Sequence, residues 1–507
     1  MKPTSLLDLR TGLIALASGL KPFRDRELVG ARPSPSAQAL RPRAGTLPLA
    51  GGIALAVGLL QCWLIFHHSP WRDEEQALLV AQQPLGVLFA QLHYEGHPAL
   101  YYLMLKAATL VSPGIWALRL TAAACSLATL GLIWSRSPFG LLDKVALSLN
   151  YLIFFEYGVI ARSYGLGMLI FFAFVAVRRA RGFGPWVLLA LLANVSVHTA
   201  MLAAICALWL LKEGRWSWKG CAILGLGAGV AVLTLWPAHD FVSTVSGALT
   251  PMERAALTLA NASDLLTWSN PLHPVAVWET AAPFRAALLI GALFPVVGLL
   301  ALRRSGDHRD LFSLYFLALF AFGALIYVGW LRHLGFAALL MIGFLWAQAE
   351  AGEPPNAVAR TWMALAALGG VWFAVTALVV PFSGASALSE WAIQTGKVNE
   401  PWAVTWGPIG PDFTGMTGRP IFNLQRGCRN TYQRWNYDTA KLVTNADITA
   451  FAQAAGGGYV MSPVPLDGAA GRQFEHVFAG VMWPETIYVY HVWPIGPAKP
   501  KVLPVCT

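Results

Sequence analysis

The sequence predicts an α-helical polytopic membrane protein with about eleven transmembrane helices and a small C-terminal α/β domain outside the cytoplasm. Two observations support this prediction. Of the 507 residues, 56% are hydrophobic and 12% are charged, whereas soluble domains usually carry about 25% charged residues. Apolar stretches close to the ~20 residues that cross a bilayer recur between residues 47 and 382. The composition therefore argues against a soluble, disordered or fibrous protein.

Basic, apolar and amphipathic segments alternate over residues 1–115, and this alternation predicts the first elements of the chain. Residues 1–46 are basic and Pro-rich, and we expect a cytoplasmic tail. A first span at about 47–66 leads into an external loop, 67–115, in which 77–92 and 99–111 are expected to lie along the membrane surface. A helix over 99–111 would be about 20 Å long, which is too short for a hydrocarbon core of about 30 Å.

The other ten spans are expected at approximately 116–134, 145–160, 164–177, 185–198, 199–211, 220–237, 284–302, 311–329, 334–349 and 362–382. A polar external loop, 238–283, separates the seventh span from the eighth. Together these segments form a membrane domain over 47–382.

Lys and Arg residues gather on one side of these spans. The tail and one set of loops hold 20 of them, whereas the opposite side holds seven before residue 383. Because cytoplasmic loops are enriched in Lys and Arg, we expect the N-terminus in the cytoplasm. An odd number of spans then puts residues 383–507 outside the cytoplasm. The net charge of +10 therefore reflects topology and does not indicate nucleic acid.

The segment 383–507 has the pattern of a small soluble domain. TIYVYHVW at 486–493 has the aromatic and β-branched content of a strand, and 458–464 is a second candidate strand. A helix is expected near 445–455. Cys428 and Cys506 share this domain, and in an oxidising compartment they either form a disulfide or remain two free thiols.

The densest acidic cluster lies in the first external loop, with Asp73, Glu74, Glu75 and Glu95 near several histidines. Apolar interfacial segments flank the cluster and hold it against the membrane. Polar groups in other outward turns are candidates to converge on it: Glu156, Arg162, His198, His239, Asp240, Arg332 and His333. Charges near bilayer depth are costly unless they are paired or face a wet cavity. The alternatives are a solvated loop for the acids and snorkelling helix ends for the arginines.

Four segments of the sequence resemble segments of one protein family, and they occur in the same order along the chain. W-R-D-E-E-Q-A at 71–77 resembles the acidic block in the first external loop of GT-C glycosyltransferases, membrane enzymes that use lipid-phosphate-linked sugars. E-G-H-P-A-L-Y-Y-L-M-L at 95–105, W-A-L-R-L at 116–120 and E-Y-G-V-I-A-R-S-Y-G-L at 156–166 resemble the segments that follow. Protein O-mannosyltransferases and lipid A aminoarabinose transferases share this architecture. The resemblance implies a multi-pass protein of the bacterial inner membrane, with residues 383–507 in the periplasm.

The resemblance implies a role for each matching residue. Asp73 corresponds to the catalytic acid, the expected general base, and Glu74 would support it or help to bind a divalent metal. His97 and His239 are the other candidate metal ligands, and the resemblance implies no further cofactor. The candidates for binding the substrate and its phosphate are Arg72, Glu95, Arg119, Glu156, Arg162, Arg332 and His333.

The expected chemistry is transfer of a sugar from a polyprenyl phosphate to an acceptor hydroxyl. Phosphate is a good leaving group, so the reaction needs one base and several cations, and attack opposite the phosphate inverts the anomeric carbon. The acceptor is a lipid, a glycan or a protein. Two other functions stay open: a transporter or flippase of lipid-linked sugars, for which internal repeats are expected, and a non-catalytic scaffold whose exported domain binds a partner.

Overall fold

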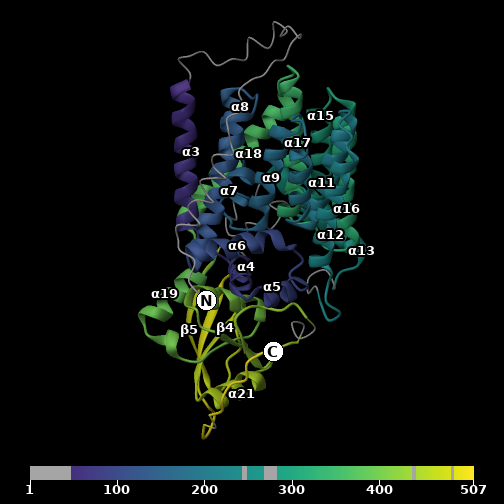
Figure 1. Ribbon diagram of the computed structural model, residues 1–507. Coiled ribbons are helices and arrows are strands. Elements are labelled where there is room, and N and C mark those ends of the chain that lie inside the picture. The colour runs from purple at the N-terminus through teal and green to yellow at the C-terminus, as the bar shows by residue number, and fades with distance from the viewer. Residues whose placement is uncertain are drawn as a thin grey trace, which may run out of the picture. The chain divides into compact units, whose positions relative to one another are not determined.

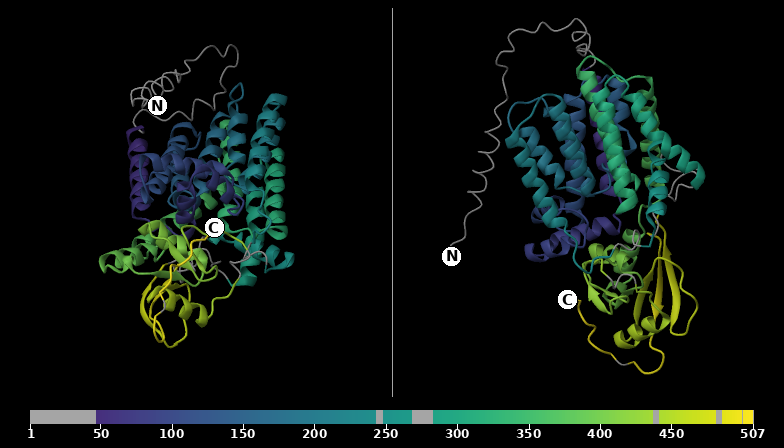
Figure 2. Two further views of the ribbon diagram at one scale, coloured as in Figure 1. Left: turned by 60° about the horizontal axis from the view of Figure 1, so that its bottom comes forward. Right: turned by 90° about the vertical axis from the view of Figure 1, so that its right-hand side faces the viewer.

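The protein has a helical part and a sheet domain at one end of it (Figure 1). The structure, a computed structural model, describes residues 47–242, 248–267, 283–436, 441–480, 485–498 and 500–506. The predicted tail, 1–46, and part of the predicted loop 238–283 lie outside these residues. Short helices lie crosswise where the two parts meet, and the two further views show the same arrangement (Figure 2).

Within the described ranges, seven helices are long and apolar enough to cross a membrane. They are α3 (Leu47–His67), α7 (Ile115–Arg136), α12 (Trp218–Leu235), α15 (Phe284–Ala301), α16 (Gly306–Leu325), α17 (Leu331–Glu350) and α18 (Ala357–Val379). Four shorter apolar helices of the described residues accompany them: α6 (Ala99–Val111), α9 (Ser163–Val177), α10 (Gly184–Ala193) and α11 (Val197–Lys212). The structure therefore confirms a polytopic helical fold, while the total of eleven spans stays a prediction.

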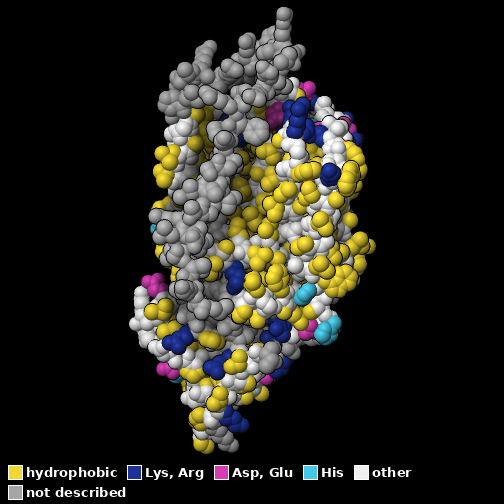
Figure 3. Space-filling view, viewed as in Figure 1, with side chains coloured by type: hydrophobic (Ala, Val, Ile, Leu, Met, Phe, Trp, Pro, Cys, Tyr) yellow, Lys and Arg dark blue, Asp and Glu magenta, His cyan; other side chains and the backbone are white. Residues whose placement is uncertain are grey.

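The helical part has the surface of a membrane protein. Apolar side chains predominate on the part of its visible face that is coloured, and Lys and Arg side chains lie toward the two ends, near the sheet domain and away from it (Figure 3). Helix α17 is apolar on all sides and buried along almost its whole length, so it forms the centre of the bundle. Core side chains of the bundle include Phe171, Phe336 and Trp346.

The predicted span 145–160 is wrong as a single helix. The chain forms α8 (Leu141–Ser148) and a π-helical turn, η2 (Leu152–Glu156), and then runs irregularly to Arg162. The Gln61 amide donates hydrogen bonds to the carbonyl oxygens of Ile153 and Phe154, at 3.2 and 2.8 Å. A side chain from another helix thus satisfies backbone groups that the break exposes, which permits irregular backbone within the bundle.

Three helices lie across the end of the bundle: α4 (Arg72–Gln82), α5 (Leu85–Leu92) and α6 (Ala99–Val111) (Figure 1). Helix α6 has the bounds that the sequence predicts. The Lys106 ammonium donates to the carbonyl oxygens of Ala81 and Gln83, at 3.2 and 2.6 Å, and so ties α6 to the end of α4.

Two further helices belong to the predicted external loop: α13 (Pro251–Asn261) and α14 (Asp264–Thr267). Thr250 and Glu253 form a capping box at the start of α13, and this helix packs against α15 and α16. Arg254 donates to the carbonyl oxygens of Ala324 and Leu325, which lie at the end of α16. The loop is therefore partly helical and packed onto the bundle.

The C-terminal domain is built on one mixed sheet with strand order β3-β2-β1-β4-β6-β5. Its strands are β1 (Trp402–Val404), β2 (Ile421–Asn423), β3 (Cys428–Asn430), β4 (Gly458–Ser462), β5 (Arg472–Phe478) and β6 (Ile487–Val492). Strand β1 is parallel to both β2 and β4, and the other pairs are antiparallel. The predicted strands at 458–464 and 486–493 are confirmed as β4 and β6.

Helices cover both faces of this sheet. One face packs against α19 (Ala385–Gln394), η4 (Gly407–Ile409) and α20 (Gly410–Thr417), with Phe413 and Met461 in the shared core. The opposite face packs against α21 (Asn445–Ala455), with Phe451 and Val460 in a second core. Helix α21 has the predicted bounds, and the short 3-10 turn η3 (Lys397–Asn399) follows α19.

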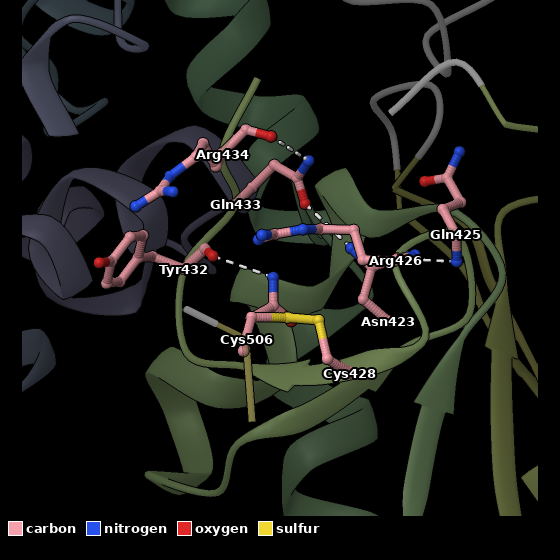
Figure 4. The surroundings of a disulfide bond; sticks show 9 residues. Asn423, Gln425, Arg426, Cys428, Tyr432, Gln433, Arg434 and Cys506 are labelled. Atoms are coloured by element: carbon pink, nitrogen blue, oxygen red, sulfur yellow. Dashed lines mark hydrogen bonds between the residues drawn. A yellow bond between two sulfur atoms is a disulfide. The ribbon is translucent and has the colours of Figure 1, made fainter. Parts of the chain in front are cut away.

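A disulfide joins Cys428 to Cys506, with Cα atoms 5.1 Å apart, so the paired alternative is the one that the structure shows. It fixes the C-terminal segment to β3, where the Cys506 amide donates to the Arg429 carbonyl oxygen. Figure 4 shows the disulfide beside the segment Tyr432–Arg434. That segment reaches the membrane part, because Gln76 and Gln91 both donate to the Gln433 carbonyl oxygen, at 2.7 and 2.9 Å.

Candidate active site

A cavity of about 880 Å³ lies between the crosswise helices, one end of the bundle and the C-terminal domain. The residues that line its membrane half come from separate segments: Arg72, Asp73, Gln76, Tyr94, Glu95, His97, Arg162, Tyr164, His198, Arg332 and His333. Three of the residues expected to form the site, Asp73, Arg162 and Arg332, therefore share one cavity although 259 positions separate the first from the last.

Asp73 is the carboxylate at the centre of the positive charge in this cavity. Its Oδ2 lies 3.4 Å from Arg162 Nη1, and its Oδ1 lies 3.5 Å from Arg72 Nε. Burial alone would raise the pKa of Asp73, but Arg162, Arg72 and Arg332 outweigh burial and lower it below its usual value. The side chain is 20% exposed, so an ionised carboxylate faces the cavity at neutral pH.

Trp71 organises the three arginines. The indole is fully buried, and the guanidinium carbons of Arg72, Arg332 and Arg162 lie 5.4, 5.7 and 5.9 Å from its ring centre. Each distance is within the range of a cation–π interaction. Sequence reasoning missed Trp71, and its place directly before the acidic block was the available signal. Because the Trp71 ring attracts all three guanidinium groups, these three positive charges can lie close together around the cavity.

Glu74 holds the backbone around the site instead of facing the cavity. Its Oε1 accepts a hydrogen bond of 2.6 Å from the Ala161 amide, and its Oε2 lies 2.8 Å from His68 Nε2. The Trp71 amide donates to the same Oε2 at 3.2 Å. These contacts fix the segment before Arg162 against the start of α4. These contacts make Glu74 a positioning residue, which agrees with a supporting role beside Asp73 and not with a ligand that faces the cavity.

Glu95 lines the cavity and accepts hydrogen bonds from three side chains. Gln76 and Gln91 donate to Oε1 at 2.6 and 2.8 Å, and the Tyr102 hydroxyl donates to Oε2 at 3.2 Å. Burial raises the pKa of Glu95 to about 7, although these donors and Arg162 act in the opposite direction. Glu95 therefore changes charge near neutral pH, unlike Asp73.

Histidines and a tyrosine form the wall of the cavity near Arg332. His97 Nε2 lies 3.2 Å from Arg162 Nη2, so this nitrogen accepts from the guanidinium. Burial and then Arg162 lower the pKa of His97 to about 3, and the ring stays neutral. The predicted His333 stacks on His198, with ring centres 4.1 Å apart, and its Nε2 lies 3.1 Å from the Tyr164 hydroxyl oxygen.

The sequence matches no protein-family model, and comparison with curated proteins finds no match. Solved structures do match. The apo crystal structure of ArnT from Cupriavidus metallidurans has a TM-score of 0.52 at 11% identity, over 88% of this chain and 98% of that one. The chain shares its fold with ArnT. ArnT bound to undecaprenyl phosphate, from the same organism, gives a TM-score of 0.48 at 14% identity, over 91% and 100%.

ArnT is a lipid A aminoarabinose transferase of the GT-C class. The fold that the four sequence segments imply, a GT-C membrane domain followed by a small sheet domain, is therefore confirmed. The shared fold extends over 88% of this chain.

The ArnT-like fold places Arg119 and Glu156 away from the described lining of the cavity. Arg119 lies against Trp116, with its guanidinium carbon 5.3 Å from the ring centre, and acts on the charge of Glu75. Glu156 accepts a hydrogen bond of 2.5 Å from the buried Tyr151 hydroxyl. The helix is broken before Arg162, whose guanidinium contacts Asp73.

His239, the second candidate metal ligand, is exposed and outside the described lining, so it does not join His97. No group of three His, Cys, Asp or Glu side chains with metal-binding geometry occurs in the part of the chain that the structure describes. His97 also directs a nitrogen at Arg162. The described residues therefore do not fit the predicted metal site.

Proposed function

We propose that this protein is a glycosyltransferase that moves a sugar from a polyprenyl-phosphate donor to an acceptor hydroxyl outside the cytoplasm, with inversion. The observation that carries the proposal is one ionised carboxylate, Asp73, among three arginines in a cavity at the end of a membrane bundle. The shared fold supports it, because ArnT belongs to the GT-C glycosyltransferases. A lipid carrier suits a cavity that adjoins the bundle.

In this mechanism Arg72, Arg162 and Arg332 bind the donor phosphate. Asp73 accepts the proton of the acceptor hydroxyl as its oxygen bonds to the anomeric carbon from the face opposite the phosphate. The bond from that carbon to the phosphate oxygen breaks, and its electron pair leaves with the phosphate, whose charge the arginines stabilise. No step passes through a metal, since the described ligands do not fit one.

The arginines link donor binding to the basicity of Asp73. Before the donor binds, the guanidinium groups lower the pKa of Asp73 and make it a weak base. A bound phosphate shares these positive charges, so Asp73 becomes a stronger base only when the donor is present. The enzyme then deprotonates an acceptor only in the loaded site.

The orientation in the membrane is part of the proposal. Helices α9 and α11 begin at the cavity, and basic residues lie at their other ends, Arg178 just after α9 and Lys212 at the end of α11; cytoplasmic loops are rich in Lys and Arg. We infer that this end faces the cytoplasm and that the cavity and the C-terminal domain face the periplasm. The site then meets donors on the outer leaflet of the inner membrane.

The test is complementation of a deletion strain followed by mass spectrometry of its lipids and envelope glycans. We expect the deletion strain to accumulate a polyprenyl-phosphate sugar and to lose one sugar from an envelope molecule. Wild type and Asp310→Asn, an exposed control, should reverse both effects. Asp73→Asn should reverse neither, because loss of a general base costs about 10²–10⁴-fold in rate.

Three results would count against the proposal. Full transfer by Asp73→Asn at normal protein level would exclude Asp73 as the base. A donor lipid that stays on the cytoplasmic leaflet of the deletion strain would favour the flippase. An unchanged set of lipids and glycans after deletion would favour the scaffold.

A further inference from the structure

The cavity extends beyond the arginines to one end of the C-terminal sheet. Residues at the ends of three strands form this part of its lining. Thr405 and Trp406 follow β1, Gln425 lies just after β2, and Pro463 and Val464 follow β4. We name these five residues the sheet-end surface. They belong to the same cavity as Asp73.

The strand order explains why a binding crevice opens at this end of the sheet. The chain leaves β1 through α20 on one face, and it enters β4 from α21 on the opposite face. Strands β1 and β4 are parallel neighbours, with Val404 beside Met461. The connections therefore diverge between these two strands. In open α/β sheets, ligands bind outside the carboxyl ends of the strands at such a switch point.

We propose that the sheet-end surface binds the acceptor and that the accepting group is a sugar ring. This inference rests on the proposed transfer reaction. The same cavity would thus hold the donor phosphate at its membrane end and the acceptor at its sheet end, with Asp73 between them.

The distribution of charge separates the two ends. The membrane end contributes three arginines. Of the described lining residues in the C-terminal domain, one is a cation, Lys441, and none is an acid; Lys441 Nζ lies 3.1 Å from Asp447 Oδ1. A phosphate is therefore favoured at the membrane end, and a neutral group is favoured at the sheet end.

The side chains at the sheet end suit a carbohydrate. Trp406 and Trp435 are partly exposed and supply indole rings, while Thr405 and Asn445 supply a hydroxyl and an amide. A sugar ring presents apolar C–H groups on its faces and hydroxyls at its rim. Indole rings pack against the former, and neutral polar side chains bond to the latter. Val464 and Leu442 complete an apolar rim.

Contacts between the two parts align the sheet end with Asp73. Helix α20 packs on α4, and a Cβ at Gly415 would collide with the Glu75 carboxylate, so the two helices approach closely. The backbone N–H of Gln433 donates a hydrogen bond of 2.8 Å to Gln76 Oε1. The Arg72 guanidinium carbon lies 5.1 Å from the Trp406 ring centre. A hydroxyl on a ring held at the sheet end therefore faces the helix that carries Asp73.

Val464→Trp tests the location of the acceptor, because Val464 is half exposed at the cavity and a larger side chain would fill the crevice. Leu442→Trp is a second filling variant, at an exposed position of the same rim. Val477→Phe is the control, because Val477 is about as exposed as Val464 but lies on β5, outside the described lining. In the complemented deletion strain we expect at least 10-fold less transfer with either Trp variant and a change below 2-fold with Val477→Phe. Purified variants should bind undecaprenyl phosphate with affinities within 2-fold of wild type.

Each other outcome overturns the inference. Normal transfer by both Trp variants would show that the acceptor does not use the sheet end. Loss of undecaprenyl phosphate binding by folded Trp variants would assign this end to the donor. Linkage analysis settles the class of acceptor, because attachment to a protein side chain or to a lipid glycerol would exclude a sugar ring. If wild type transfers nothing, the proposed function itself fails.

Discussion

Replacing Arg162 with lysine separates the charge of this residue from its geometry. The guanidinium donates from Nη1 to the Asp73 carbonyl oxygen at 2.6 Å and contacts His97 Nε2 from Nη2 at 3.2 Å. A lysine keeps the positive charge beside Asp73, but one ammonium group cannot span both partners. The variant should therefore fold and bind donor while the Asp73 carboxylate, the proposed base, loses its fixed position.

The expected loss of activity follows from these contacts. A hydrogen bond that involves a charged group contributes about 1.5–3 kcal/mol. Loss of one such bond corresponds to a decrease in rate of about 10- to 150-fold, since ~1.4 kcal/mol is one factor of ten. Arg162→Ala should be worse, because it leaves the partly buried Asp73 without its nearest cation, which costs about 3–5 kcal/mol in buried pairs.

The assay measures sugar transfer in membranes of the deletion strain, supplied with the lipid-linked sugar that this strain accumulates. Arg179→Lys is the matched control, because Arg179 is 56% exposed and its Nη1 lies 3.4 Å from Glu350 at the opposite end of the bundle. The control should stay within 2-fold of wild type. A rate for Arg162→Lys that is also within 2-fold would refute the geometric argument.

Two further predictions concern stability. Serine at both Cys428 and Cys506 should lower the unfolding free energy of the C-terminal domain by about 2–5 kcal/mol, because the disulfide closes a separation of 78 residues; an unchanged unfolding midpoint in denaturant would contradict this. Burial raises the pKa of Glu75 to about 8 and that of Glu95 to about 7, so the folded state binds more protons than the unfolded state above about pH 4.5, and stability falls as pH rises from there through 8. The melting temperature should decrease between pH 5.5 and 8.5 and decrease less in Glu75→Gln, and an equal decrease in both proteins would exclude Glu75 as a cause.

Hydrophobic patterning correctly predicted those helices and strands whose backbone is regular along their whole length. The bounds of α6 and α21 follow from their apolar periodicity, and β4 and β6 follow from their β-branched and aromatic content. The span predicted over 145–160 failed because hydropathy averages side chains and ignores the backbone. There, the buried Gln61 amide bonds to two carbonyl oxygens of η2 and stabilises a break.

The acidic block shows where sequence reasoning stops at the site. Asp73, Glu74 and Glu75 follow one another on α4, and consecutive residues on a helix point about 100° apart. Each carboxylate therefore meets different surroundings: Asp73 faces the cavity, Glu74 binds the Ala161 amide, and Glu75 is buried against α20. The sequence alone does not show which of the three carboxylates faces the cavity.

The sequence by itself predicted the membrane domain, the C-terminal sheet domain and the acidic segment that lines the cavity, because these follow from composition and local periodicity. Only the tertiary structure decided which charges meet. Trp71 gathers three arginines from distant segments, Glu156 and Arg119 lie elsewhere, and the ends of β1, β2 and β4 complete the cavity. The physical reason is that a partly buried charge needs partners within a few ångströms, and those partners are set by the packing of whole helices.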